Sequence, residues 1–137
     1  MPIPHLNWVA VLVSGIVIFM LGGLWYSPVL FARQWVALMG KSEEEMKASA
    51  SGALPYAFVF LCGLVTAFVL GSVMNHFPPY TALRGAMVGA ICWLGFAAPS
   101  SFATGTFSAT PRRLWLINSG YNLVSFIVAG GILALWR

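Results

Sequence analysis

The chain has 137 residues, of which 60% are hydrophobic and 7% are charged, and it carries a formal net charge of +4. An ordinary soluble domain is about 45–50% apolar and about 25% charged, and a domain this small has too little interior to bury such an excess of apolar surface. The composition therefore excludes a soluble enzyme, a secreted disulfide scaffold and a disordered tail, and it indicates a multi-pass membrane protein.

The first apolar run predicts a membrane span over about residues 6–29. At about 1.5 Å of rise per residue, roughly 20 apolar residues cross the hydrocarbon core of a bilayer. No Lys or Arg precedes this run and its end is aromatic. We therefore interpret it as a retained span rather than as a cleaved signal peptide.

The longest connection, over about residues 31–50, predicts a short amphipathic helix in the membrane interface. Its apolar residues fall at helical spacing on one side: Phe31, Trp35, Leu38 and Met39. Ser42 and Glu45 then form a capping box, which predicts a second short helix. We interpret the acidic residues after Ser42 as a solvated helix face rather than as a metal site.

Three further runs are long and apolar enough to cross a membrane. They cover about residues 55–75, 83–104 and 111–136. The runs are continuous rather than alternating, which favours helices and excludes a β-barrel. At the start of the last run, Thr110 is expected to cap the helix and Pro111 to occupy its first turn. Together the four spans predict one all-α transmembrane domain over residues 1–137.

The distribution of Lys and Arg predicts the orientation in the membrane. The first and third connections carry five basic residues, Arg33, Lys41, Lys47, Arg112 and Arg113, and the opposite side carries two, Arg84 and Arg137. Basic residues accumulate in cytoplasmic loops and contact anionic headgroups there. We therefore expect connections one and three in the cytoplasm and both termini outside. Scattered in this way, the basic residues do not indicate a nucleic-acid partner.

Several segments of the chain are similar to those of a known family. Asn7-Trp8 opens the first span, Leu-Trp-Tyr-Ser-Pro (24–28) closes it, and Ile-Asn-Ser-Gly-Tyr (117–121) lies in the last. With these motifs the chain resembles the DUF1761 family of small integral membrane proteins over nearly its whole length. The resemblance implies the four-span fold and no particular reaction. Family members often carry His where this chain has Asn122, so a role for a titrating imidazole does not carry over.

A group of polar and aromatic residues is expected at a shared depth in the inner half of the membrane. Its members are Trp25, Tyr26, Ser100, Asn118, Tyr121 and Asn122. Asn118 and Asn122 are four residues apart and share one helix face. An unpaired amide in lipid costs several kcal/mol, so this face must point into the bundle or into an oligomer interface. The group either lines a small pocket for a neutral or lipidic ligand or forms hydrogen bonds between helices.

Small residues recur at every fourth position in the second and third spans. Gly63, Ala67 and Gly71 form one series, and Gly85 and Gly89 form a G-x-x-x-G motif. Such residues let helix backbones approach closely, within one molecule or between copies. Because four short spans bury little surface against each other, we expect a homo-oligomer.

The residue types that the chain lacks bear on function. There is no Asp, and the three Glu all lie in the first connection. An ion-coupled transporter would need an acid or a Lys within the membrane. Ser100 and Ser101 have no His or acid that the sequence places beside them, so we expect no enzyme, no cofactor and no metal. A passive channel for a small solute, or an accessory subunit of a larger membrane complex, remains the alternative to a ligand-binding bundle.

Overall fold

The computed structural model describes residues 5–49 and 52–137, and it is all-α. Its elements are α1 (Trp8–Trp25), α2 (Ala32–Met39), α3 (Glu43–Ser49), α4 (Leu54–Met74), α5 (Ala82–Cys92), the π-helix η1 (Trp93–Ala97), α6 (Ala98–Phe107) and α7 (Arg112–Leu135). Four helical stretches are long and apolar enough to cross a membrane: α1, α4, α5 with η1 and α6, and α7. The predicted four-helix membrane fold is therefore confirmed, with α2 as a short helix between the first and second spans.

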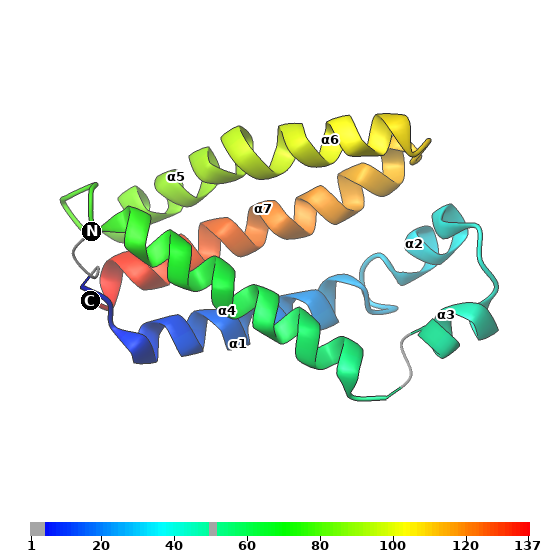
Figure 1. Cartoon of the computed structure of the whole chain (residues 1–137), viewed down its shortest axis with the longest axis horizontal. Coiled ribbons are helices and arrows are strands. Elements are labelled where there is room, and N and C mark those ends of the chain that lie inside the picture. Colours follow the sequence, from blue (N-terminus) through cyan, green and yellow to red (C-terminus); the bar gives the residue numbers. More distant parts are fainter. Residues whose placement is uncertain (1–4, 50–51) are drawn as a thin grey trace.

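The helices run between two ends of an elongated bundle (Figure 1). The start of α1, the α4–α5 loop and the end of α7 lie at one end, which we call the terminal end. The short helices α2 and α3 and the α6–α7 turn lie at the other, which we call the connector end. The five basic residues of the first and third connections therefore share the connector end.

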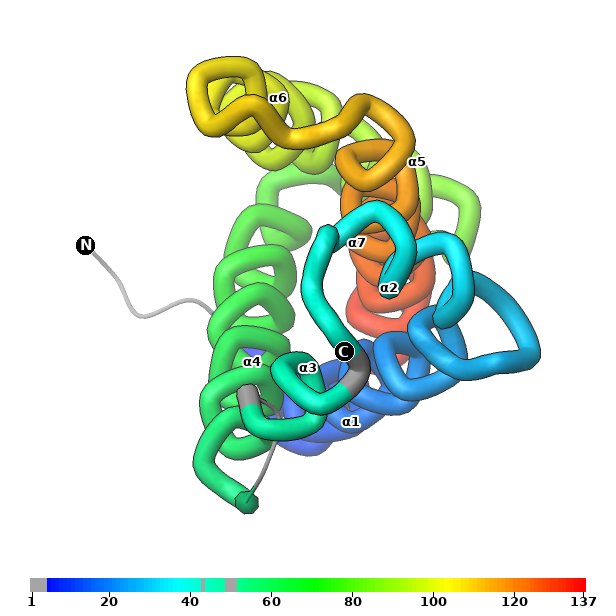
Figure 2. The backbone as a smooth tube through the Cα atoms, turned by 90° about the vertical axis from the view of Figure 1, so that its right-hand side faces the viewer, coloured from blue at the N-terminus to red at the C-terminus, as the bar shows by residue number. Residues whose placement is uncertain are grey.

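Helix α7 is the centre of the bundle. It contacts α1, α2, α4, α5, η1 and α6, whereas α4 and α5 barely touch each other. Figure 2, which views the molecule from the connector end, shows α5–α6, α4 and α1 grouped around α7, with α2 in front of its near end. Any site shared by several helices is consequently built on α7.

Glycine allows the closest helix contact, which joins α5 to α7. A Cβ atom at Gly85 would overlap the backbone carbonyl of Gly130, and one at Gly89 would overlap that of Phe126. Small side chains also let α4 approach its neighbours: Ala67 is fully buried, and Gly71 lies under Leu133 of α7. Gly63 faces the carbonyl of Gly15 and the side chain of Ile18 in α1, with both contacts at 3.4 Å from an added Cβ.

Two helix ends differ from the sequence prediction. The first span ends at Trp25 rather than near residue 29. Pro28 disfavours a helical backbone at Ser27, whose hydroxyl donates a hydrogen bond to the Leu24 carbonyl at 2.6 Å. The expected Thr110 cap is wrong, because Pro111 occupies the N-cap position, α7 begins at Arg112 and no side chain caps it.

The third span contains a π-helix that the sequence analysis did not predict. Its five residues, Trp93–Ala97, end two residues before Pro99. Pro99 has no N–H to donate and its ring crowds the preceding turn, so the regular ladder of hydrogen bonds cannot continue through it. The chain widens by one residue there, and the Ala98 N–H donates to the Trp93 carbonyl.

The connector forms the two short helices that the sequence predicts. The Glu45 N–H donates to Ser42 Oγ at 3.2 Å, as expected for the capping box that starts α3. Helix α2 ends at Gly40, whose φ of 68° lies in the left-handed region. Rather than standing apart from the bundle, α2 packs against α7.

Candidate functional site

On the α1 side of α7, hydrogen bonds join the two helices. Trp25 Nε1 donates to the Ile117 carbonyl at 2.9 Å, and the Tyr26 hydroxyl donates to Asn118 Oδ1 at 2.6 Å. One turn deeper, the Tyr121 hydroxyl donates to the Ile18 carbonyl at 2.8 Å. These bonds fix the second half of α1 and its C-terminal end against the first half of α7.

Aromatic rings surround these bonds and connect them to α2. The Tyr26 ring meets the Tyr121 ring edge to face at a centroid distance of 5.8 Å, and it lies 5.0 Å from the Trp35 ring of α2. The Trp25 ring lies 4.9 Å from that of Phe31. On this side, ring contacts and hydrogen bonds therefore hold α1 and α2 to α7.

On the other side of α7, an open groove of about 440 Å³ separates it from α6. We call this the α6–α7 groove. It is lined by Ser100, Ser101, Thr104, Gly105, Ser108 and Thr110 of α6 and the turn, and by Trp115, Asn118, Ser119 and Asn122 of α7. Apart from Gly105 and Trp115, every one of these residues carries a hydroxyl or an amide, and none is charged. Such groups both donate and accept hydrogen bonds, so the groove can bind a neutral polar group.

Two serine hydroxyls of the groove bond carbonyls of the π-helix. Ser101 Oγ donates to the Ala97 carbonyl at 2.6 Å, and Ser100 Oγ donates to the Phe96 carbonyl. The serine hydroxyls thereby satisfy carbonyls near the interrupted ladder. Ser101 Oγ also accepts a hydrogen bond from Trp115 Nε1 at 3.0 Å, which ties α6 to α7 across the groove.

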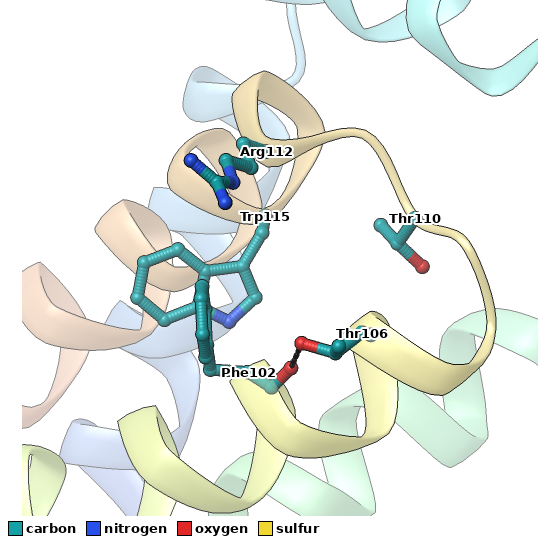
Figure 3. Close-up of a pocket in the computed structure, with 6 residues that line it drawn as sticks. Phe102, Thr106, Thr110, Arg112 and Trp115 are labelled. Atoms are coloured by element: carbon teal, nitrogen blue, oxygen red, sulfur yellow. Dashed lines mark hydrogen bonds between the residues drawn. The ribbon is translucent and has the colours of Figure 1, made fainter.

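A second hollow of about 300 Å³ adjoins the groove at the connector end. Figure 3 shows Trp115 at its centre, with the Phe102 ring edge against it, Arg112 above and Thr106 and Thr110 to one side. The Phe102 and Trp115 ring centroids are 5.1 Å apart. Trp115 therefore forms the partition between the uncharged groove and a hollow that has one cationic side chain at its rim.

Several polar groups of the groove have no partner. Ser119 is 4% exposed, yet its hydroxyl makes no hydrogen bond with another described residue. The Asn122 side chain likewise makes none within the described ranges, and Asn118 uses only its Oδ1. Outside the groove lining, the indole N–H of Trp93 and the hydroxyl of Ser14, in α1, are buried without a partner among the residues described. Unused hydrogen-bonding groups thus line the groove, and the α1 side also holds one.

The structure divides the six predicted residues between the two sides of α7. Trp25, Tyr26 and Tyr121 lie on the α1 side, and Ser100 and Asn122 line the α6–α7 groove. Asn118 belongs to both, because its amide oxygen bonds Tyr26 while the residue lines the groove. The six therefore do not line one common pocket.

Sequence reasoning missed most of the hydroxyl side chains of the groove. Ser100, Thr104 and Ser108 are spaced four residues apart, which places them on one face of α6. That spacing was a readable signal. Ser119 lies three residues before Asn122 on the same face of α7, but only the packing of α6 beside α7 places that face on the groove. In the part of the chain that the structure describes, no three His, Cys, Asp or Glu side chains lie together as metal ligands would.

A comparison with known families assigns the chain. The profile of a family described as "Protein of unknown function (DUF1761)" matches residues 9–134. The chain belongs to the DUF1761 family. No curated protein and no solved structure matches it. Membership of DUF1761 agrees with four candidate spans, but the family description assigns no function. Any functional proposal therefore has to rest on the geometry of the grooves.

Proposed function

We propose that this DUF1761 protein is a membrane-embedded binding protein for a small neutral or lipidic ligand, held in the α6–α7 groove. The observation that carries the proposal is the uncharged lining of the groove, which is rich in hydroxyls and amides and in which Ser119 and Asn122 make no hydrogen bond with another described residue. Hydroxyls and amides both donate and accept hydrogen bonds. A bound hydroxyl, ester or amide would therefore pair with these groups.

The predicted polar residues are paired differently on the two sides of α7, and this difference supports a ligand rather than helix packing alone. On the α1 side, the Tyr26 and Trp25 donors have acceptors on α7. Interhelical hydrogen bonds of this kind account fully for those residues. The lining of the α6–α7 groove contains eight hydroxyl or amide side chains, of which Ser119 and Asn122 are unpaired among the described residues. Its polarity therefore exceeds what the association of α6 with α7 requires.

The lining also favours binding over catalysis and over an ion pathway. No His, Cys, Asp, Glu or Lys lines the groove or the adjoining hollow. A hydrolase needs a base beside its nucleophile, and an ion-coupled carrier needs an ionisable group. We accordingly propose a non-enzymatic role.

A passive channel is the less favoured alternative. Toward the terminal end, the carbonyls of Gly130 and Phe126 sit directly against Gly85 and Gly89. These backbone contacts close the space between α5 and α7 beyond the groove. A continuous polar path between those helices would have to pass through them.

We further propose that the protein forms homo-oligomers, alone or within a larger membrane complex, with its connector end in the cytoplasm. In each candidate span, 28% or less of the most apolar stretch is buried inside the molecule, so most of its surface is free to face lipid or another copy. The five basic residues at the connector end, against two at the terminal end, support the orientation. A reporter fused after Arg137 tests the orientation. If the C-terminus lies outside, a labelling reagent confined to the cytoplasm should not reach the reporter.

The binding proposal is tested by native mass spectrometry on protein extracted gently from its membrane, followed by titration with monoolein, a neutral lipid with two hydroxyls. We expect a bound species of a few hundred daltons, and binding that Asn122→Leu and Ser119→Ala each weaken. Ser72→Ala is the matched control, because Ser72 lies on α4, outside the groove, and bonds the Phe68 carbonyl. Wild-type protein without any bound neutral species, or equal binding by all variants, contradicts the proposal.

A further inference from the structure

A separate groove of about 400 Å³ lies between α2 and α7 at the connector end. We call this the α2–α7 groove. Its lining is Phe31, Gln34, Ala37 and Leu38 from the α2 side, and Arg113, Leu116 and Ile117 from α7. Arg113 and Asn122 are nine residues apart, which at about 100° per residue places them on opposite faces of α7. This groove is thus independent of the α6–α7 groove.

The lining combines an apolar floor with a single cation. Phe31, Leu38 and Leu116 contribute hydrocarbon, and Leu116 is 61% exposed. The Arg113 guanidinium makes no hydrogen bond and no ion pair with another residue of the described ranges. The Gln34 amide is the one other polar side chain that lines the groove. A ligand that complements this surface is an amphiphile with an anionic head and a hydrocarbon tail.

The position in the fold narrows the amphiphile to a lipid. The groove lies at the end of a membrane-spanning helix, beside a short helix with an apolar side, where headgroups and acyl chains of a bilayer meet. A guanidinium binds phosphate through two parallel hydrogen bonds, and a charge-assisted bond is about twice as strong as a neutral one. The connector end also carries the larger share of the basic residues, which attracts anionic lipid to this surface.

We propose that the α2–α7 groove binds an anionic phospholipid, with the phosphate against Arg113 and Gln34 and one acyl chain along Leu38, Leu116 and Ile117. The bound lipid fills the space between α2 and the bundle. It thereby holds the connector against α7 and links the position of α2 to the composition of the surrounding leaflet.

The test compares binding of phosphatidylglycerol and phosphatidylcholine, with matched acyl chains, to detergent-solubilised protein by native mass spectrometry. We expect the wild type to bind phosphatidylglycerol more tightly than phosphatidylcholine. In Arg113→Gln the ratio of the two affinities should fall about tenfold, as the loss of one charge-assisted hydrogen bond implies. Arg33→Gln is the matched control. It removes the same charge from the same end, on α2 itself, but Arg33 does not line the groove. Equal effects of the two variants overturn the proposal in favour of general surface charge.

Two further measurements separate the headgroup from the chain and guard against misfolding. Glycerol 1-phosphate carries the anionic head without hydrocarbon, and we expect it to compete at least tenfold more weakly than phosphatidylglycerol. Ala37→Phe places a ring in the groove and should block the lipid while circular dichroism shows the helices intact. Competition by the soluble phosphate as strong as by the lipid, or unchanged lipid binding in Ala37→Phe, overturns the acyl-chain part of the proposal. Arg113→Lys keeps the charge without the paired geometry and should retain part of the preference.

Discussion

Adding a single methyl group at Gly89 tests how the closest helix contact stabilises the bundle. A Cβ atom there would lie 2.7 Å from the carbonyl carbon of Phe126 and 3.3 Å from the nitrogen of Ile127, closer still to the carbonyl oxygen. All of these are backbone atoms of α7, so no side-chain rotation can relieve the overlap. Gly89→Ala must therefore move α5 away from α7 or distort one of them.

The size of the effect follows from comparison with a second glycine. Replacing Gly by Ala in a helix by itself stabilises it by roughly 0.5–1 kcal/mol, and an added methyl that does not fit costs about 1–3 kcal/mol. Gly23 of α1 has no heavy atom within 4 Å of an added Cβ, so Gly23→Ala gains the first effect without the second. The difference between the two variants isolates the overlap, and we expect it to be about 1–3 kcal/mol.

The assay is reversible unfolding in mixed micelles with increasing SDS, followed by circular dichroism of the helices. Gly89→Ala should unfold at a lower SDS fraction than the wild type, and Gly23→Ala at the same or a higher fraction. A Gly89→Ala protein as stable as Gly23→Ala would refute the reasoning. It would mean that α5 and α7 do not meet through their backbones at this position.

Two other predictions concern named contacts. In a double-mutant cycle of Tyr26→Phe and Asn118→Leu, we expect a coupling of about 0.6–2 kcal/mol in the same unfolding assay, because the 2.6 Å hydrogen bond joins these two side chains; additive effects would contradict it. Gly40→Ala should destabilise the end of α2 by about 1 kcal/mol, since its φ of 68° disfavours a side chain although nothing crowds the position. Faster hydrogen exchange of the α2 amides, with unchanged exchange in α4, measures this; uniform exchange would count against it.

The spans could be predicted because the membrane imposes a simple rule on the sequence. A backbone in hydrocarbon must satisfy its own hydrogen bonds, so about 20 apolar residues in a row indicate a helix. Short motifs also predicted structure correctly where a side chain satisfies a nearby backbone group, as Ser42 does for the Glu45 N–H at the start of α3. Where two local signals competed, the prediction was wrong: Pro111 took the N-cap position that was assigned to Thr110.

The candidate site was harder to predict because it depends on which faces of α7 meet which helices. The sequence placed Tyr26, Ser100 and Asn122 at one depth, but depth along the membrane does not give the angle around a helix. The packing of α1 on one side of α7 and α6 on the other separates Tyr26 from Ser100. Ser119 and Asn122 support one proposal and Arg113 the other, and only the structure shows which groove each of them lines.

The sequence by itself thus determined the membrane class, the four spans, the helical connector and the family, because each depends on composition, run length or contiguous motifs. Only the tertiary structure decided that α7 is central, that Gly85 and Gly89 face its backbone, and that polar residues split between a packed side and an open groove. In lipid there is no hydrophobic force to select one helix face over another, since the solvent is as apolar as the side chains. Close packing and the pairing of polar groups make that selection, and both are properties of several helices together.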